Sequence, residues 1–180
     1  MSAGVRLFYA LWPPPAARAK LAVSAAAIAL AAPAYAVREE KYHLTVAFVG
    51  EVPADGEDRV RRIGGELRAP KFAITCDAYE YWPKPEVVVA AARNIPAALQ
   101  GLWDELHRAL AADGFEVRIK RLRPHFTLAK RVAADPALPA FEPLTWLASD
   151  LRLVRSETGA DRSVYTVVDT WSLLDKPGDA

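Results

Sequence analysis

Two short segments of the chain have the same pattern of a histidine followed two residues later by a threonine. They run from His43 to Ala47 and from His125 to Ala129, and each reads histidine, apolar residue, threonine, apolar residue, alanine. In a strand, successive side chains alternate between the two faces, so each histidine points the same way as its threonine. Each segment therefore offers an imidazole beside a hydroxyl.

This pairing suits chemistry at a phosphodiester. Attack of water on phosphorus needs a base that takes a proton from the water and an acid that gives one to the departing oxygen. Histidine, with an ordinary pKa of about 6.5, can do either near neutrality, and two histidines divide the tasks. The hydroxyls of Thr45 and Thr127 can donate to the non-bridging phosphate oxygens, where negative charge is held during attack.

A single histidine ahead of an alternating strand is as often a half-buried residue without a catalytic role. The repetition favours function, because two of the three histidines in the chain have a threonine at this spacing. The third, His107, lacks that partner. It lies next to the apolar stripe of a predicted helix, which predicts a position on the surface.

With these motifs the chain resembles the two-histidine phosphoesterases, and within them the RNA 2′,3′-cyclic phosphodiesterases, also called 2′-5′ RNA ligases. The resemblance covers nearly the whole chain, and the paired motifs are its specific part. It also includes the first predicted strand, the continuation of both motifs and two segments near the end, namely Arg6–Ala10, Phe48–Glu51, Pro124, Leu153–Ser156 and Tyr165.

The resemblance implies an α+β fold of two lobes related by pseudo-twofold symmetry, with antiparallel sheets that face a central cleft. Both motifs are expected to face this cleft, and no metal ion or other cofactor is implied. By analogy His43 is the proton donor to the departing 3′ oxygen, and His125 is the proton acceptor that activates water. The product is then a 2′-phosphomonoester, with Thr45 and Thr127 on the phosphate oxygens.

A cation next to the second motif is expected to bind the phosphate. Many relatives carry arginine at the position of Lys130, and lysine keeps the charge without the bidentate fork of a guanidinium. By strand alternation Arg131, and not Lys130, shares the face of His125 and Thr127. Either residue can supply the cation, and the sequence leaves the choice open.

Two broader features fit an RNA end as the partner. Basic residues cluster beside the second motif with no acidic residue among them, although such a run can equally be a solvated face; they are Arg118, Lys120, Arg121, Arg123, Lys130 and Arg131. Several aromatic residues are candidates for stacking on a base, as in proteins that bind single-stranded RNA; they are Tyr9, Trp12, Tyr42, Trp82 and Tyr165.

The composition predicts one compact domain over residues 1–180, since 52% of the residues are hydrophobic and 25% are charged. A net charge of +1 excludes the strongly basic surface of many duplex-DNA binders. The single cysteine, Cys76, excludes an internal disulfide and fits a reducing cytoplasm. The apolar run from Leu21 to Ala36 begins too late for a signal peptide and is short for a membrane span, so it predicts an alanine-rich buried helix.

The apolar pattern also predicts the elements that position the motifs. Strands are expected over 6–12, 42–49, 72–81, 86–92, 115–120, 125–132, 151–155 and 164–171, and helices over about 13–32, 58–67 and 97–111. Two strand-helix-strand units result, each with a histidine motif in its second strand. This order indicates a duplicated architecture of mixed α and β structure, with a cleft between the halves.

Three functions remain open at this point. The first is hydrolysis of 2′,3′-cyclic phosphate ends of RNA, by a monomer that is not attached to a membrane. The second is 2′-5′ ligation, in which a 5′-hydroxyl replaces water and the same acid and base serve. The third is a module that only binds nucleotides or RNA ends, which would not need both imidazoles. The sequence lacks a P-loop, a calcium loop and a His-Glu-x-x-His helix, which argues against ATP-driven or metal-driven chemistry.

Overall fold

The computed structural model describes residues 5–53, 55–116, 121–132, 136–158 and 163–175. Its helices are α1 (Pro15–Ala31), α2 (Gly56–Glu66) and α3 (Ala97–Ala112), with a short 3-10 turn at Glu39–Lys41. Its strands are β1 (Val5–Leu11), β2 (Tyr35–Ala36), β3 (Leu44–Val52), β4 (Phe72–Cys76), β5 (Ala78–Trp82), β6 (Val87–Ala91), β7 (His125–Lys130), β8 (Leu144–Ala148), β9 (Asp150–Thr158) and β10 (Ser163–Ser172).

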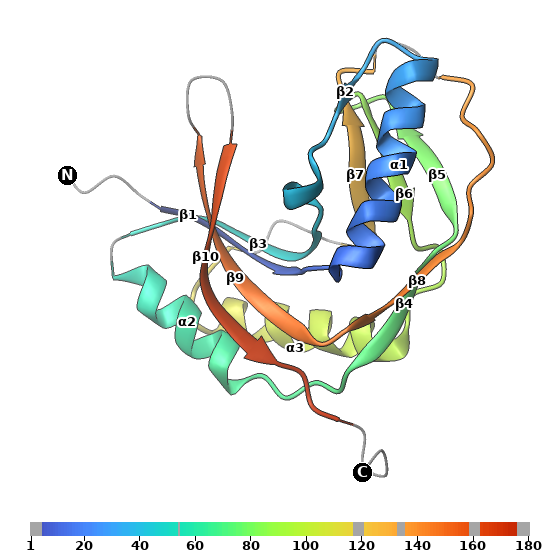
Figure 1. Cartoon of the computed structure of the whole chain (residues 1–180). Coiled ribbons are helices and arrows are strands. Elements are labelled where there is room, and N and C mark those ends of the chain that lie inside the picture. Colours follow the sequence, from blue (N-terminus) through green and yellow to red (C-terminus); the bar gives the residue numbers. More distant parts are fainter. Residues whose placement is uncertain (1–4, 54, 117–120, 133–135, 159–162, 176–180) are drawn as a thin grey trace.

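Two four-stranded antiparallel sheets form the two lobes (Figure 1). The first sheet has the strand order β10-β9-β1-β3, and the second has the order β2-β7-β6-β5. The two-stranded sheet β4-β8 connects the lobes, because β4 leads into β5 of the second sheet and β8 leads into β9 of the first. The predicted two-lobed α+β fold with antiparallel sheets is confirmed.

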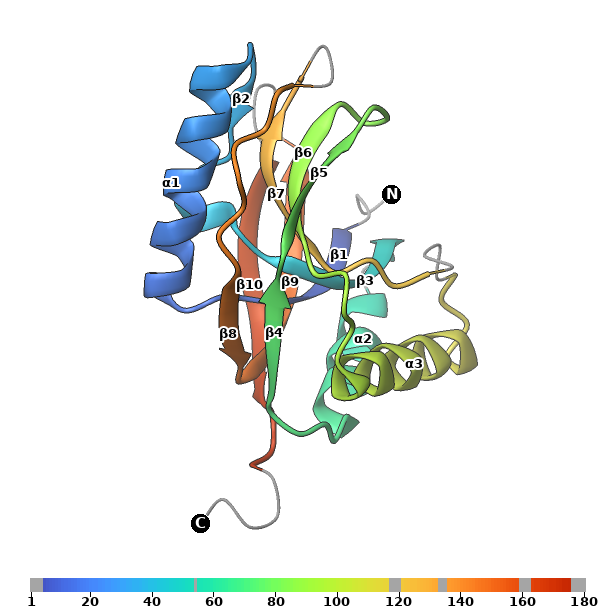
Figure 2. The ribbon, with the colours of Figure 1, turned by 90° about the vertical axis from the view of Figure 1, so that its right-hand side faces the viewer.

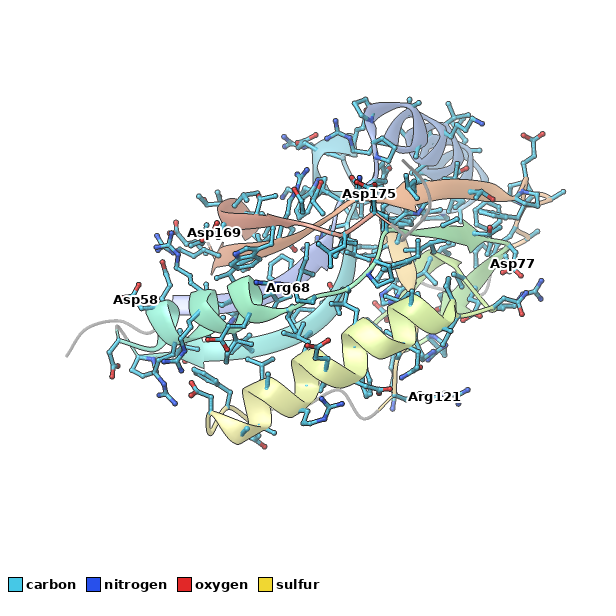
Figure 3. All side chains as sticks on the ribbon, turned by 90° about the horizontal axis from the view of Figure 1, so that it is seen from below. Asp58, Arg68, Asp77, Arg121, Asp169 and Asp175 are labelled. Carbon is cyan, nitrogen blue, oxygen red and sulfur yellow. The ribbon has the colours of Figure 1, made fainter. Side chains whose placement is uncertain are left out.

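Each lobe is covered by a helix that follows a strand of the other lobe (Figures 1 and 2). α1 follows β1 of the first sheet but packs against β7 and β2 of the second. α3 follows β6 of the second sheet but packs against β3 of the first and against α2, and the two helices lie side by side under that sheet (Figure 3). Because each lobe is covered by a helix that the other lobe supplies, we propose that residues 1–180 form one domain.

α1 begins directly after Pro13 and Pro14, where missing backbone donors cost nothing. Its buried residues recur at helical spacing and are Ala17, Leu21, Ala25 and Ile28. The expectation of a buried helix holds for this stripe only, because Val23 is 72% exposed and Leu30 is 89% exposed. None of the helices in the described part of the chain is both long and apolar enough to cross a membrane.

The predicted strand over 72–81 is in fact two strands that belong to different sheets. The chain changes sheet at Asp77, so that β4 pairs with β8 and β5 pairs with β6. The short strand β2 and the strand β8 were not predicted. The strand expected over 115–120 lies mostly outside the described residues.

The packing of α2 on the first sheet gives a test of this fold. Gly64 faces the ring of Trp171, and a Cβ at Gly64 would overlap that ring. Gly64→Ala is therefore expected to lower the free energy of unfolding by about 1–3 kcal/mol through overpacking. Gly101 in α3 has no atom within 4 Å of such a Cβ, so Gly101→Ala should raise stability by about 0.5–1 kcal/mol. Urea denaturation of both variants measures the difference, and equal effects would contradict this packing.

Candidate active site

Each motif strand contains a β-bulge three residues after its histidine. The pairing of β1 with β3 skips Val46, and the pairing of β6 with β7 skips Leu128. An inserted residue reverses the alternation, so the side chain five positions after each histidine returns to the face of the histidine and threonine. These side chains are Phe48 in the first motif and Lys130 in the second.

The bulge corrects the expectation for Arg131. Strand alternation placed Arg131 on the catalytic face, but Lys130 lines the pocket there and Arg131 does not. Arg131 instead has a positive φ of 56°, and its guanidinium lies 5.1 Å from the ring centre of Tyr35. A signal for the bulge is present in the sequence, because each motif has two adjacent apolar residues that break the alternation. Both residues of each pair are fully buried, namely Val46, Ala47, Leu128 and Ala129.

The two motifs meet in one pocket between the lobes. Its volume is about 210 Å³, and its lining includes both histidines and both threonines. The remaining lining residues are Val37, Lys41, Phe48, Lys130 and Tyr165. A cavity of this size has room for a phosphate group, and its imidazoles, hydroxyls and lysines suit the charge of that group.

Both imidazoles make the same hydrogen bond. His43 Nδ1 lies 2.8 Å from the carbonyl oxygen of Lys41, and His125 Nδ1 lies 2.6 Å from the carbonyl oxygen of Arg123. A carbonyl only accepts, so each Nδ1 carries a hydrogen and donates it. The other ring nitrogen, Nε2, is left to take or give a proton. Both rings are therefore held in the tautomer that an acid and base pair needs.

Aromatic rings surround His43. Trp12 stacks on the imidazole at 5.1 Å and 22°, Phe8 lies at 5.0 Å, and the edge of Tyr165 lies at 5.3 Å between ring centres. Burial among these rings lowers the pKa of His43 from its usual 6.5 to about 4, even though its hydrogen bond to Lys41 acts in the opposite direction. The nearby cations lower this pKa further.

His125 lies beside Trp82, with 4.5 Å between the ring centres. The guanidinium of Arg123 covers Trp82 at 4.0 Å. The carboxylate of Glu80 accepts hydrogen bonds from both, at 2.8 Å from Trp82 Nε1 and 3.0 Å from Arg123 Nη2. Burial lowers the pKa of His125, and the hydrogen bond to the Arg123 carbonyl raises it; the charge of Arg123 lowers it and that of Glu80 raises it. The second histidine is thus held by a hydrogen-bonded cluster, whereas the first is held by aromatic packing.

The aromatic residues singled out in the sequence divide into those that contact the histidines and those that are buried elsewhere. Trp12, Tyr165 and Trp82 contact the histidines, whereas Tyr9 and Tyr42 are buried and donate hydrogen bonds to the backbone of Val60 and Val37. His107 is half-buried and packs on Trp103 at 4.0 Å, so the predicted surface position is wrong. In the basic cluster, Arg118 and Lys120 lie outside the described residues.

Sequence reasoning missed several residues of the site. Val37, Lys41 and Phe48 line the pocket, and Phe8 and Glu80 contact its histidines or their neighbours. Phe48 could have been found as the counterpart of Lys130. The others come from segments without a motif. Among the residues that the structure describes, no group of three or more histidine, cysteine, aspartate or glutamate side chains is arranged to bind a metal ion.

Comparison with known proteins gives a consistent family. The family model described as LigT-like phosphoesterase matches residues 11–90. The RNA 2′,3′-cyclic phosphodiesterase of Thermus thermophilus is 31% identical over 187 aligned residues, which cover 97% of this chain and 93% of that protein. The protein of the same name from Escherichia coli (strain K12) is 29% identical over 139 residues, 76% of this chain and 78% of that protein.

Solved structures share the fold. The crystal structure of E. coli LigT complexed with 3′-AMP has a TM-score of 0.81 and 28% identity, and the match covers 94% of this chain and 98% of that one. The crystal structure of TT0787 from T. thermophilus has a TM-score of 0.80 and 27% identity, with 96% and 100% covered. The similarity therefore includes both lobes and the cleft between them.

The environments of the two histidines predict their titration. We expect His43 to titrate near pH 4 and His125 below 6.5, measured by NMR of the imidazole C–H protons. Glu80→Gln removes the carboxylate that raises the pKa of His125, so this pKa should fall further while that of His43 stays unchanged. A higher pKa of His125 in Glu80→Gln would contradict this arrangement.

The low pKa of His43 also predicts how stability depends on pH. Between pH 6.5 and 4 the unfolded chain binds more protons than the folded chain, so the free energy of unfolding should decrease as the pH falls through this range.

Proposed function

The chain belongs to the LigT-like phosphoesterases, and we propose that it hydrolyses 2′,3′-cyclic phosphate ends of RNA to 2′-phosphomonoesters without a metal ion. One observation carries this proposal: two imidazoles, each with Nδ1 committed to a backbone carbonyl, face one phosphate-sized pocket. The names of its relatives, RNA 2′,3′-cyclic phosphodiesterases, support the choice of substrate.

In the proposed reaction, Nε2 of His125 takes a proton from a water molecule as its oxygen attacks phosphorus. The bond between phosphorus and the 3′ oxygen breaks, and the proton on Nε2 of His43 moves to that oxygen. The phosphate stays on the 2′ oxygen, with one new oxygen from water. His125 leaves the reaction protonated and His43 neutral, and exchange with solvent restores both.

A bound phosphate favours the protonated form of His43 that the acid role requires. Without a bound anion, His43 has a pKa of about 4 and is neutral at pH 7. A phosphate anion in the pocket favours the protonated form of both histidines and offsets the effect of Lys130. We assign the acid role to His43 by analogy with the family.

The phosphate oxygens are proposed to bind Thr45, Thr127 and Lys130. The two hydroxyls approach from opposite lobes, so a phosphate between them is oriented from both sides. Lys130 adds a charge-assisted hydrogen bond, and the second ammonium group in the pocket, Lys41, donates to the carbonyl oxygen of Ser163 at 2.8 Å. We further propose that the protein acts as a monomer in the cytoplasm, where its one cysteine, buried and with its thiol pKa raised to about 12, stays reduced.

The histidines provide the first test. In excess EDTA, the purified protein should open a 2′,3′-cyclic phosphate oligoribonucleotide to a 2′-phosphate, followed by phosphorus NMR. His43→Ala and His125→Ala should each lower kcat by roughly 10²- to 10⁴-fold, the range for loss of a general acid or base. His107→Ala is the matched control and should retain the rate, since His107 does not line the pocket.

Other outcomes decide between the alternatives. Binding of the oligonucleotide without any product would favour a binding module. A product joined to an added 5′-hydroxyl oligonucleotide would favour ligation. Activity that disappears with EDTA and returns with a divalent metal would contradict the metal-free mechanism.

The bulge in β7 predicts different roles for two adjacent cations. Lys130→Ala should lower kcat/KM by about 10- to 100-fold, because a hydrogen bond to a charged group contributes roughly 1.5–3 kcal/mol. Arg131→Ala removes the same charge from the neighbouring position outside the pocket and should change kcat/KM by less than about threefold. Steady-state kinetics on one cyclic substrate compare them. A larger loss of kcat/KM in Arg131→Ala than in Lys130→Ala would mean that Arg131, and not Lys130, binds the phosphate.

A further inference from the structure

A second cavity adjoins the phosphate pocket. It has a volume of about 400 Å³ and shares Lys41 and Tyr165 with the phosphate pocket. Its other lining residues come from the loop after β1, the segment after β2, and strands β9 and β10, and they are Trp12, Arg38, Glu40, Arg152, Ser163, Val164 and Val167. The two cavities therefore meet at Lys41 and Tyr165, beside the histidines. We refer to this cavity as the side groove.

The floor of the side groove is a continuation of the catalytic face of the first sheet. In that sheet Ala10 of β1 pairs with Arg152 of β9, and Val154 of β9 pairs with Val167 of β10. Phe8, Ala10 and Val154 form one buried cluster with Trp12 and Tyr165 packed against it, and both of these aromatic residues contact His43. The same face thus carries the acid histidine at one end and the groove at the other.

The lining of the side groove combines apolar surface with positive charge. Val164 and Val167 line the groove and are 54% and 45% exposed, and Val167 shares the face of Tyr165. The guanidinium of Arg152 is oriented by two hydrogen bonds to Asp150, at 2.7 and 3.3 Å, and lies 5.7 Å over the ring of Trp12. A nucleotide has a flat apolar base and an anionic phosphate, and grooves that bind single strands offer the same combination.

The charge balance distinguishes the side groove from another cavity, which adjoins the phosphate pocket at Phe48. The side groove has the basic residues Arg38, Lys41 and Arg152. Glu40 pairs with Arg38 at 3.6 Å and Asp150 pairs with Arg152 at 2.7 Å, which leaves one net positive charge. The cavity at Phe48 has Arg6 and Arg59 against Glu51 and Glu116, with no net positive charge. An anionic chain that leaves the phosphate pocket is therefore attracted toward the side groove.

From this placement we infer that the side groove binds the nucleotide that precedes the cyclic end, so that the preferred substrate is an RNA chain and not a free cyclic nucleotide. The inference rests on the proposed hydrolysis of cyclic phosphate ends. Arg38 and Lys41 contact the phosphate that joins the last two nucleotides, and the preceding base lies against Val164 and Val167. The terminal ribose and its cyclic phosphate occupy the phosphate pocket.

The test compares a 2′,3′-cyclic mononucleotide with a short oligoribonucleotide that has the same cyclic end. Wild type should have a higher kcat/KM on the oligonucleotide. Arg38→Glu and Val167→Glu should lower that value by about tenfold, as expected for one lost stacking or phosphate contact. On the mononucleotide both variants should stay within about twofold of wild type, because neither residue lines the phosphate pocket.

Two matched variants control for charge and exposure. Arg68→Glu reverses an exposed charge next to α2, as Figure 3 shows, and Val23→Glu replaces an exposed valine of α1 with a carboxylate. Neither residue lines the side groove or the phosphate pocket. Both should leave the ratio of the two kcat/KM values unchanged, and circular dichroism checks that all four variants are folded.

Each remaining result decides the inference. Equal losses on both substrates would overturn it, because the groove would then bind the terminal nucleotide itself. No loss on either substrate would overturn it as well. If wild type hydrolyses neither substrate, the proposed hydrolysis fails, and fluorescence anisotropy of a labelled oligonucleotide with wild type and Arg38→Glu then measures the groove separately. Equal affinity in that measurement would also overturn the inference.

Discussion

The hydrogen bond from each imidazole Nδ1 to the carbonyl two residues earlier is the constraint on which the site depends. It is made by the backbone just ahead of each motif strand, at Lys41 and at Arg123. Because the carbonyl has no proton to give, the bond fixes the tautomer as well as the ring orientation. Nε2 of His43 and Nε2 of His125 are then both available to a ligand in the pocket. A ring flip in either lobe would break this bond and turn Nε2 away from the pocket.

The two lobes have the same β-bulge but place different side chains in the pocket. The bulge places the fifth residue after each histidine in the pocket, and this residue is Phe48 in one lobe and Lys130 in the other. The pseudo-symmetric frame therefore presents an apolar wall opposite a cation. The neighbours of the histidines differ in the same way, with aromatic packing around His43 and a hydrogen-bonded cluster around His125. The two histidines therefore have distinct surroundings although the motifs are alike.

The parts of the site that the sequence predicted are those that depend on short-range geometry. The relation between a histidine and a threonine two residues later holds in any strand, so both pairs were found. The position of Lys130 in the pocket depends on a bulge in the pairing with β6, whereas alternation alone placed Arg131 on that face and left the choice of cation open. Long-range packing also decided the rest: β2 is only two residues long, and the chain changes sheet at Asp77 within one apolar segment.

Burial of the histidines connects substrate binding to chemistry. When no anion is bound, burial and then the neighbouring cations lower the pKa of His43 to about 4, so its Nε2 carries no proton at pH 7. An anion is the group that reverses this, since it offsets the cations and favours the imidazolium. In the proposed reaction the acid therefore forms when a phosphate occupies the pocket. A neutral ester of similar size would find two bases and no acid there, so we expect the charges of the pocket to select for phosphate.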